Sequence, residues 1–557
     1  MSKEKKEAVS ADAIADTAAD TAADTRGANI FRKEVQGNLA RYRKILHFTS
    51  STTKAAAIML LCAIISVAVA NSGAYTPFLE FWETEFGFVL GGGHASLSFA
   101  EIINDVFMAI FFLLVGLEIK YEMTVGELTN IRQALLPILA ACGGVLAPIA
   151  IYSIFNITNP DTAHGWGVPT ATDIGFALGI MALLGNRVPN GVRVFLSTLA
   201  VADDIIAIIV IAVFYGHTPS FFWLGMAALV LLMLIALNRR HVYSLLPYLL
   251  LGVVLWFCVF QSGVHATIAG VLLAFTLPSG SRVNLKNFAQ WSDDHVAKAR
   301  EQFDENEPVL GQKEYLSTVG SLSTVAREVI PPATRLEKRL FPWVYFMILP
   351  LFALTNADVC LQGANIMQTI TSPVFLGIFF GLLLGKPIGI MLMSFIVVKT
   401  KLASLPENVT WLHMLGASIL GGVGFTMAIF VANLAFADEA LVTAAKLGIL
   451  LASACAGIIG FAFLMAEAKR AKTAGVAYLA VAGHQDNLQT ADIEAAAKSR
   501  ELLDSIESPL IRAEIDARIE QGDLTAEVVI DLGENNRRSD EAALHERNGD
   551  QDRLGAD

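Results

Sequence analysis

Charged residues are scarce in this chain of 557 residues: Asp, Glu, Lys and Arg together make up 17%, whereas soluble domains average about a quarter. The five cysteines are scattered, and their spacing fits neither a disulfide framework nor a metal site. The phosphate-binding pattern GxxxxGKS/T is absent, so no motif indicates ATP as an energy source. We therefore expect no enzyme chemistry, no cofactor and no nucleic-acid partner. An ion gradient is the expected driving force.

Long hydrophobic runs occupy most of the chain instead. Hydrophobic residues make up 54% of it, and its mean hydropathy is +0.54. A helix needs about 20 residues to cross the hydrocarbon core of a lipid bilayer. The pattern predicts an all-α polytopic membrane protein with about 12 transmembrane helices, of which the fourth, seventh and eighth are short or interrupted. The spans are expected at residues 54–72, 99–121, 132–156, 168–185, 190–214, 220–237, 244–260, 263–279, 341–358, 373–398, 410–436 and 440–466.

Basic residues are distributed unequally between the loops, and positively charged short loops stay in the cytoplasm. Lys and Arg occur before the first span and next to the end of every even-numbered span. The alternation predicts twelve spans with both termini in the cytoplasm, in a multi-pass protein of a bacterial plasma membrane. The loops that contain neither Lys nor Arg are 73–98, 157–167, 215–219, 359–372 and 437–439.

The two ends of the chain differ in composition from its hydrophobic body. Residues 1–45 are an N-terminal tail with a low-complexity acidic stretch and no apolar segment typical of a signal peptide. Residues 473–557 are a polar tail, which beyond residue 484 carries 19 acidic and 8 basic residues. We expect both tails to be mostly solvated, although 491–522 is partly amphipathic. The transport domain is expected at 46–472, with a cytoplasmic loop at 281–340, of which residues 281–334 look exposed and loosely structured.

Two adjacent carboxylates, Asp203 and Asp204, lie inside the span expected at 190–214. A charge at bilayer depth costs about 3 to 10 kcal/mol, depending on the reference state, and by default marks an ion or proton pathway. When ionised, the two side chains can hold one small cation; otherwise they can carry one or two protons. The pair therefore predicts an exchange of a cation for protons.

Two spans contain sequences that interrupt a helix. In the fourth span, Pro169 removes a backbone donor, and Thr172 and Asp173 follow it. In the eleventh span, a glycine-rich sequence runs from Gly421 to Thr426. Non-helical backbone at membrane depth is tolerated where it is buried in protein or lines a cavity. The alternatives are a simple helix cap at Asp173 and glycine-mediated packing of ordinary helices.

Lys386 lies in the middle of the tenth span, too far from either end to reach the interface easily. An unpaired buried ammonium either loses its proton or needs a buried acid. Asp203 and Asp204 point about 100° apart around one helix, so we expect one to line the cavity and the other to face Lys386. A purely structural ion pair and a titratable proton carrier are both compatible with this arrangement.

Seven motifs, in order, resemble the bacterial NhaA-type sodium/proton antiporters, over about residues 40 to 466. The resemblance implies inverted repeats with discontinuous, crossed fourth and eleventh helices, and electrogenic exchange of Na⁺ or Li⁺ outward for protons inward, for sodium and pH homeostasis. The rule that paired helix breaks mark a binding site near the bilayer midplane has this family among its own examples. The motifs are FFLLVGLEIKYE (111–122), PTATDIGFALGIMALLGNRVP (169–189), LAVADDIIAI (199–208), SGVHATIAGVLLAF (262–275), LFALTNADV (351–359), LLGKPIGI (383–390) and GGVGFTMAIF (421–430).

The resemblance also implies a role for each residue of the site. Asp204 looks like the principal ligand of the transported Na⁺, with Asp203 as its partner. Lys386 looks like the lysine that pairs with Asp203. Thr172 and Asp173 look like residues of the helix crossing that support the site.

Four further residues are implied in the response to pH. Glu118, Glu122 and Glu337 look like a cytoplasmic acidic cluster, and His265 matches a histidine that influences the pH profile in relatives. The alternative for His265 is a histidine satisfied at the start of a helix. The family also implies a small hairpin within 73–98 that contributes to a homodimer.

Two other classes of function remain open from the residues alone. A sodium-coupled symporter of an organic anion, on a related inverted-repeat fold, would offer a cationic substrate pocket, for which Lys386 is the candidate. A channel-like or structural membrane protein would not require adjacent titratable carboxylates.

Overall fold

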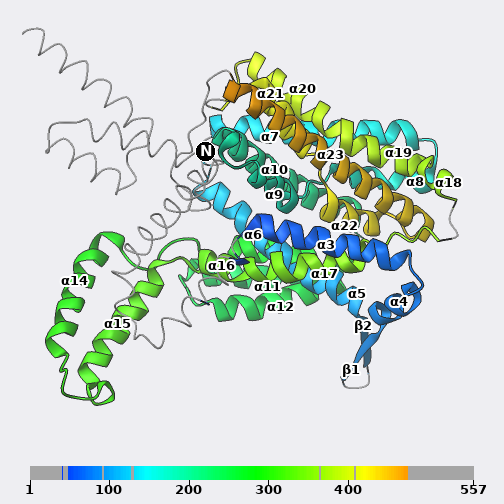
Figure 1. Ribbon diagram of the computed structural model, residues 1–557. Coiled ribbons are helices and arrows are strands. Elements are labelled where there is room, and N and C mark those ends of the chain that lie inside the picture. Colours follow the sequence, from blue (N-terminus) through cyan, green and yellow to red (C-terminus); the bar gives the residue numbers. More distant parts are fainter. Residues whose placement is uncertain are drawn as a thin grey trace, which may run out of the picture.

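The computed structural model describes residues 41, 48–49, 51–90, 93–126, 129, 131–216, 218–362, 365–406 and 409–473. Apart from residues 41 and 473, the two predicted tails, including the amphipathic stretch at 491–522, lie outside these residues. The described residues form a bundle of helices with one small β-hairpin beside it (Figure 1). The chain is an all-α polytopic membrane protein, as the hydrophobic runs predict.

Eight helical segments of the described chain are long and apolar enough to cross a membrane. In three of them a π-helical segment joins two α-helices. The first consists of α5 (Phe99–Glu101), η1 (Ile102–Phe107) and α6 (Met108–Thr124), and the second of α16 (Pro332–Trp343), η6 (Val344–Ile348) and α17 (Leu349–Asn356). The third consists of α19 (Pro373–Phe380), η7 (Gly381–Gly385) and α20 (Lys386–Lys399). The other five are α3 (Thr52–Ala70), α7 (Ile131–Asn156), α10 (Asn190–Phe214), α11 (Phe221–Arg239) and α23 (Glu439–Thr473). Single π-turns inside α-helices occur frequently at functional sites.

Two further helices are broken where the sequence predicts an interruption. The chain of α8 (Pro160–Ala163) and η3 (His164–Thr170) bends by 42° into α9 (Ile174–Leu183). In the same way α21 (Trp411–Leu420) bends by 47° into α22 (Phe425–Ala435). If each bent pair is one span, the described chain has up to ten spans by length and composition.

Two shorter apolar helices, α12 (Leu245–Gln261) and α13 (Thr267–Thr276), follow α11. The ten residues of α13 extend about 15 Å, which is half of the hydrocarbon core. The twelve helical segments fall in the predicted order, and the number of twelve crossings stays a prediction.

The prediction of a loosely structured loop at 281–334 was wrong. This segment contains α14 (Leu285–Gln302) and α15 (Lys313–Val329), which pack against each other and project from one end of the bundle (Figure 1). Apolar and aromatic residues at helical spacing explain the difference, because Phe288 and Trp291 stack on one face of α14 with ring centroids 6.4 Å apart. The ninth predicted span also begins earlier than residue 341, since Pro332 occupies the first turn of α16, where proline fits a helix.

A β-hairpin links α4 (Tyr75–Glu83) to α5. Its strands, β1 (Glu85–Leu90) and β2 (Gly93–Ser98), pair antiparallel with Glu85 opposite Ser98. Ser98 then caps the next helix, because its side chain accepts a hydrogen bond from Glu101 N while the Glu101 carboxylate accepts one from Ser98 N. The hairpin projects from the bundle at the end opposite to α14 and α15 (Figure 1).

The two ends of the bundle differ in charge. At what we call the basic end lie Arg187 and Arg193 beside the start of α10, and Arg239 at the end of α11. The opposite, basic-free end includes β1–β2 and the loops after α7 and α10, where the sequence has no Lys or Arg. Each helix below is placed relative to these two ends.

Candidate ion-binding site

The two broken helices meet at their breaks, near the middle of the bundle. The backbone N–H of Asp173 donates to Val423 O at 2.7 Å, which joins the two non-helical segments directly. The Thr172 hydroxyl donates to Gly421 O at 2.9 Å. These bonds satisfy backbone groups that a helix break leaves without partners inside the membrane. The breaks therefore form one structural unit.

Glycines allow the chain segments to approach this closely. A Cβ atom on Gly424 would lie 2.6 Å from Ala171 O, and one on Gly422 would lie 2.6 Å from Leu382 O in η7. Both distances are shorter than side chains tolerate, so the glycine-rich sequence is required by backbone contact at the crossing. Ordinary packing of continuous helices, the alternative considered from the sequence, does not describe this region.

The Asp173 carboxylate lies between the N-termini of two half-helices. Its Oδ1 accepts from Phe176 N in the first turn of α9 at 3.1 Å. Its Oδ2 accepts from Thr426 N in the first turn of α22 at 3.0 Å and from the Thr426 hydroxyl at 2.5 Å. Helix N-termini carry partial positive charge, which a carboxylate offsets. Asp173 thus caps α9 and also accepts hydrogen bonds from the first turn of α22 in the second broken helix.

Lys386 and Asp203 form a buried ion pair, as the sequence predicts for one of the two aspartates. Their side chains are 1% and 2% exposed, and Lys386 Nζ donates to Asp203 Oδ2. Lys386 Nζ also donates to the Thr172 hydroxyl at 2.5 Å, which ties the pair to the crossing. Asp203 Oδ1 is buried and has no hydrogen-bond partner in the described part of the chain. One carboxylate oxygen of the pair is therefore available.

Close backbone packing positions Lys386. A Cβ on Gly143 of α7 would lie 2.3 Å from Gly389 O, and one on Gly389 would lie 2.0 Å from Gly143 O. Small residues of this kind let helix backbones touch inside a membrane. Gly389 follows Lys386 by three residues in α20, so the contact with α7 fixes the lysine opposite Asp203.

Asp204 faces a different space from Asp203, because consecutive residues of a helix point about 100° apart. It lines a cavity of about 10 Å³, room for roughly one water molecule. Its Oδ1 is buried and has no hydrogen-bond partner among the described residues. We call this space the crossing cavity; the polar residues that line it are Glu118, Thr172, Asp173, Asp204, Tyr345 and Thr426.

The comparison with protein families decides between the possible interpretations. The model of the family described as Na⁺/H⁺ antiporter 1 matches residues 46–464. The chain belongs to this antiporter family. The match covers every residue of the crossing cavity, both helix breaks and Lys386.

Individual Na⁺/H⁺ antiporters confirm the membership. The Na⁺/H⁺ antiporter NhaA of Wolinella succinogenes is 42% identical over 420 residues, which are 75% of this chain and 92% of the relative. NhaA of Helicobacter pylori is 44% identical over 427 residues, 76% of this chain and 96% of the relative. The Na⁺/H⁺ antiporter NhaA 2 of Flavobacterium johnsoniae is 43% identical over 418 residues, 75% of this chain and 91% of the relative.

In this antiporter the three glutamates predicted for the pH response lie near one another. Glu118 of α6 lines the crossing cavity and interacts electrostatically with Glu337 of α16 and Glu122. Glu122 is one turn further along α6, toward the basic end. The acidic cluster is therefore continuous with the cavity through Glu118.

His265 lies apart from these glutamates. Its Nε2 is 2.6 Å from Tyr215 O, just beyond the last turn of α10 at the basic-free end. Eleven residues separate Asp204 from Tyr215, a rise of about 16 Å along a helix. His265 lies two residues before the first residue of α13, so the position agrees with a histidine satisfied near a helix start.

Two residues of the antiporter's cavity were missed by the sequence interpretation. Thr426 belongs to a quoted motif but was not assigned to the site, although a threonine in the first turn after a glycine-rich break is a recognisable capping candidate. Tyr345 comes from η6, and its only signal is a polar tip inside an apolar span. It lies within electrostatic range of Glu118, Asp173 and Asp204.

Proposed function

We propose that this chain exchanges Na⁺, or Li⁺, for protons across a bacterial plasma membrane. Its relatives are named as Na⁺/H⁺ antiporters, and it retains both buried aspartates, Asp203 and Asp204. The observation that carries the proposal is the Asp204 carboxylate, buried in a cavity of one-atom size with an oxygen that lacks a partner in the described chain. The symporter alternative is not supported, because Lys386, the candidate for an anion pocket, is already paired with Asp203 and Thr172.

In the proposed cation-bound state, Na⁺ is held by carboxylate oxygens. Hard cations prefer oxygen ligands, and carboxylates offset the loss of their hydration shell. Asp204 is the principal ligand because it lines the cavity. Asp203 contributes to the binding of the ion with Oδ1, the oxygen that is not bound to Lys386. Thr172 and Asp173 support the site from the helix crossing rather than by direct binding of the ion.

In the proposed proton-bound state, Asp204 carries one proton and Lys386 carries another while paired with Asp203. When Na⁺ enters between the two aspartates, Asp204 is ionised and Asp203 turns from the lysine to the ion. Lys386 then loses the partner that keeps a buried ammonium charged, and its proton leaves. Two protons are exchanged for one Na⁺, so each cycle moves one net charge and is electrogenic.

The proposed orientation places the basic end in the cytoplasm, since Lys and Arg mark cytoplasmic loops. Protons then enter from the basic-free end and Na⁺ leaves toward it. Glu118, Glu122 and Glu337 face the cytoplasmic side and are the proposed pH-responsive cluster. His265 acts on the pH profile from the external side, through its contact with Tyr215 O.

The test uses everted membrane vesicles from a bacterial strain that lacks its own Na⁺/H⁺ antiporters. Respiration acidifies the vesicles and quenches a pH-sensitive dye, and added Na⁺ or Li⁺ is expected to restore fluorescence as protons leave. Choline chloride at equal ionic strength is the control. No recovery with the protein present in the membrane would contradict the proposal. A symporter moves no protons, and uptake of labelled Na⁺ that requires an organic anion would identify one.

We also propose that two copies associate through β1 and β2. The hairpin projects from the bundle (Figure 1) and is too small to be stable by itself. Deleting residues 85–98 and closing the gap with a short glycine-containing turn should convert the dimer to a monomer in detergent, as measured by size-exclusion chromatography with light scattering. A dimer that persists would show that the interface lies elsewhere.

A further inference from the structure

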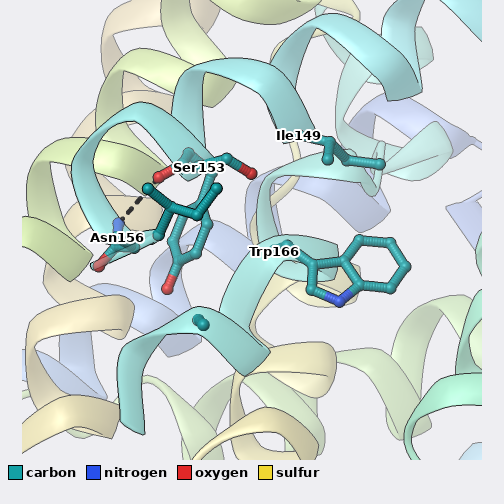
Figure 2. Close-up of a pocket in the computed structure, with 7 residues that line it drawn as sticks. Ile149, Ser153, Asn156 and Trp166 are labelled. Carbon is teal, nitrogen blue, oxygen red and sulfur yellow. Dashed lines mark hydrogen bonds between the residues drawn. The ribbon is translucent and has the colours of Figure 1, made fainter. Parts of the chain in front are cut away.

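A groove of about 340 Å³ opens beside the half-helix that leads into the crossing. Figure 2 shows α7 on one side of it, with Ile149 and Ser153 one turn apart, and Trp166 of η3 on the other. Trp166 is held in place by Phe214, against which it packs edge to face with ring centroids 5.0 Å apart. The groove is separate from the crossing cavity, which shares none of its lining residues.

The position of the groove places it at the boundary between acyl chains and headgroups. It occupies the last two turns of α7, whose apolar span ends at Asn156 at the basic-free end. Ile154, on these turns, and Ile157, directly after α7, are 76% and 74% exposed, which is the surface that a lipid-facing helix presents. Trp166 lies where tryptophan is enriched, at the membrane interface. In Figure 1, α7 and α8 lie on the other side of the bundle from β1 and β2, so the proposed dimer contact does not cover the groove.

The chemistry of the lining is apolar, with one free hydroxyl. No Asp, Glu, Lys or Arg lines the groove. The Tyr152 hydroxyl donates to Thr162 O at 2.6 Å. Asn156 Nδ2 donates to Pro373 O at 2.9 Å, whereas Asn156 Oδ1 is buried and has no hydrogen-bond partner among the described residues. The Ser153 hydroxyl points into the groove (Figure 2) and has no hydrogen-bond partner in the described chain.

We propose that this groove binds one glycerophospholipid of the leaflet at the basic-free end. An acyl chain lies between Ile149 and Trp166, and an ester carbonyl of the lipid accepts a hydrogen bond from the Ser153 hydroxyl. The headgroup is not recognised, because the lining holds no charge that would pair with a phosphate or an ammonium. The lipid contacts η3, six residues before Thr172, and so supports the outer half of the broken helix at its membrane surface.

Quenching of tryptophan fluorescence by brominated acyl chains tests the proposal on the full chain in detergent micelles. Phosphatidylcholine with brominated chains is added stepwise, and the signal of Trp166 is the difference between the wild type and Trp166→Phe. Binding at a site predicts quenching that saturates at a low ratio of added lipid to detergent. Phosphatidylethanolamine and phosphatidylglycerol with brominated chains should give the same curve; a curve that depends on the headgroup would overturn the assignment to the acyl chain and ester.

Two variants of Ser153 separate a site from general lipid contact. Ser153→Phe fills the groove and should leave only quenching that rises linearly with the added lipid. Ser153→Ala removes one hydrogen bond and should weaken binding about fivefold, which corresponds to about 1 kcal/mol. Ile154→Phe, the same enlargement on the exposed neighbour outside the lining, is the matched control and should behave as the wild type.

The contrary result is equally definite. Linear quenching of Trp166 in the wild type, unchanged by Ser153→Phe, would show that only ordinary annular lipid reaches the groove. Size-exclusion profiles and melting temperatures establish that each variant is folded. Should Ser153→Phe fail to fold, Ser153→Leu fills the groove with a smaller side chain and carries the same expectation.

Discussion

Thr426 holds Asp173 across the helix crossing by two hydrogen bonds, one from its backbone N–H at 3.0 Å and one from its hydroxyl at 2.5 Å. One carboxylate oxygen thereby joins the first turn of α22 to the start of α9. The bonds lie in the wall of the crossing cavity, next to Asp204. The contact between α9 and α22 therefore depends in part on the Thr426 hydroxyl, which a single substitution can remove.

Thr426→Val should weaken the crossing while keeping the shape of the side chain. The change removes the hydroxyl donor to Asp173 but leaves the backbone N–H in place, and a hydrogen bond to a charged group contributes about 1.5–3 kcal/mol. We expect a lower melting temperature in detergent and a weaker apparent affinity for Na⁺ in vesicles.

Thr198→Val is the matched control for that change. Both threonines are 2% exposed, but the Thr198 hydroxyl donates only to Val194 O within its own helix, at 2.9 Å. Equal effects of the two substitutions on Na⁺ affinity would mean that the bond to Asp173 has no special role in the site.

Asp204→Asn should abolish exchange while the protein still folds. The amide keeps the shape of the carboxylate but removes the negative charge that offsets the dehydration of a hard cation. The measurement is Na⁺-dependent recovery of dye fluorescence in everted vesicles, with the amount of protein in the membrane determined by immunoblot. Recovery close to that of the wild type would refute the assignment of Asp204 as the principal ligand.

Lys386→Ala should lower stability, because it leaves the buried Asp203 carboxylate without its cation. Breaking a buried pair in this way costs about 3–5 kcal/mol unless the remaining group takes up a proton. The loss should therefore be largest at alkaline pH, where a proton is hardest to obtain, and it is measured as the melting temperature at a series of pH values.

Lys446→Ala provides the comparison for Lys386→Ala. Lys446 pairs with Asp358 at 2.7 Å, and the two side chains are 12% and 14% exposed, so water reaches the group that remains. The loss of stability is therefore expected to be smaller than for Lys386→Ala, because partial contact with water lets the remaining carboxylate be hydrated or take up a proton. If both alanine variants melted at the same temperature at alkaline pH, the Lys386–Asp203 pair would not stabilise the protein as proposed.

A shortened chain spanning about residues 40–472 should retain exchange with unchanged cation selectivity. It keeps every buried charge, both helix breaks and the basic residues that orient the spans, whereas the removed tails are polar and poor in bulky apolar residues. The pH profile is expected to shift, because an acidic tail raises the local proton concentration. Loss of all exchange in a shortened protein that reaches the membrane would show that a tail belongs to the transport machinery.

The sequence predicts the site best where a charged residue lies within a run of apolar residues. Asp203, Asp204 and Lys386 stand out in apolar runs, and the 100° turn between neighbours on a helix was enough to expect that only one aspartate meets the lysine. Tyr345 could not be found in this way, because a tyrosine in a span is ordinary and its direction depends on how α16 packs. Distances along the chain likewise gave no means to separate His265 from the glutamates.

Errors in the fold have a similar origin. The segment at 281–334 is rich in charge, which suggested a solvated loop, but its apolar residues are spaced to form two helices that shield each other. The break in the fourth span was visible from Pro169, and the break in the eleventh from its glycines. The bond that joins the two breaks was not, since Val423 contributes only a backbone oxygen to it, and a backbone oxygen is present at every position.

That backbone contact has a consequence for how tolerant the protein is of mutation. The bond from Asp173 N to Val423 O does not involve a side chain, and among the ordinary residues only proline at position 173 would delete its donor. Substitutions that alter the charges of the site thus leave this junction in place. Random mutagenesis should accordingly recover many inactive proteins that still assemble in the membrane, so the ligands can diversify without the scaffold being rebuilt.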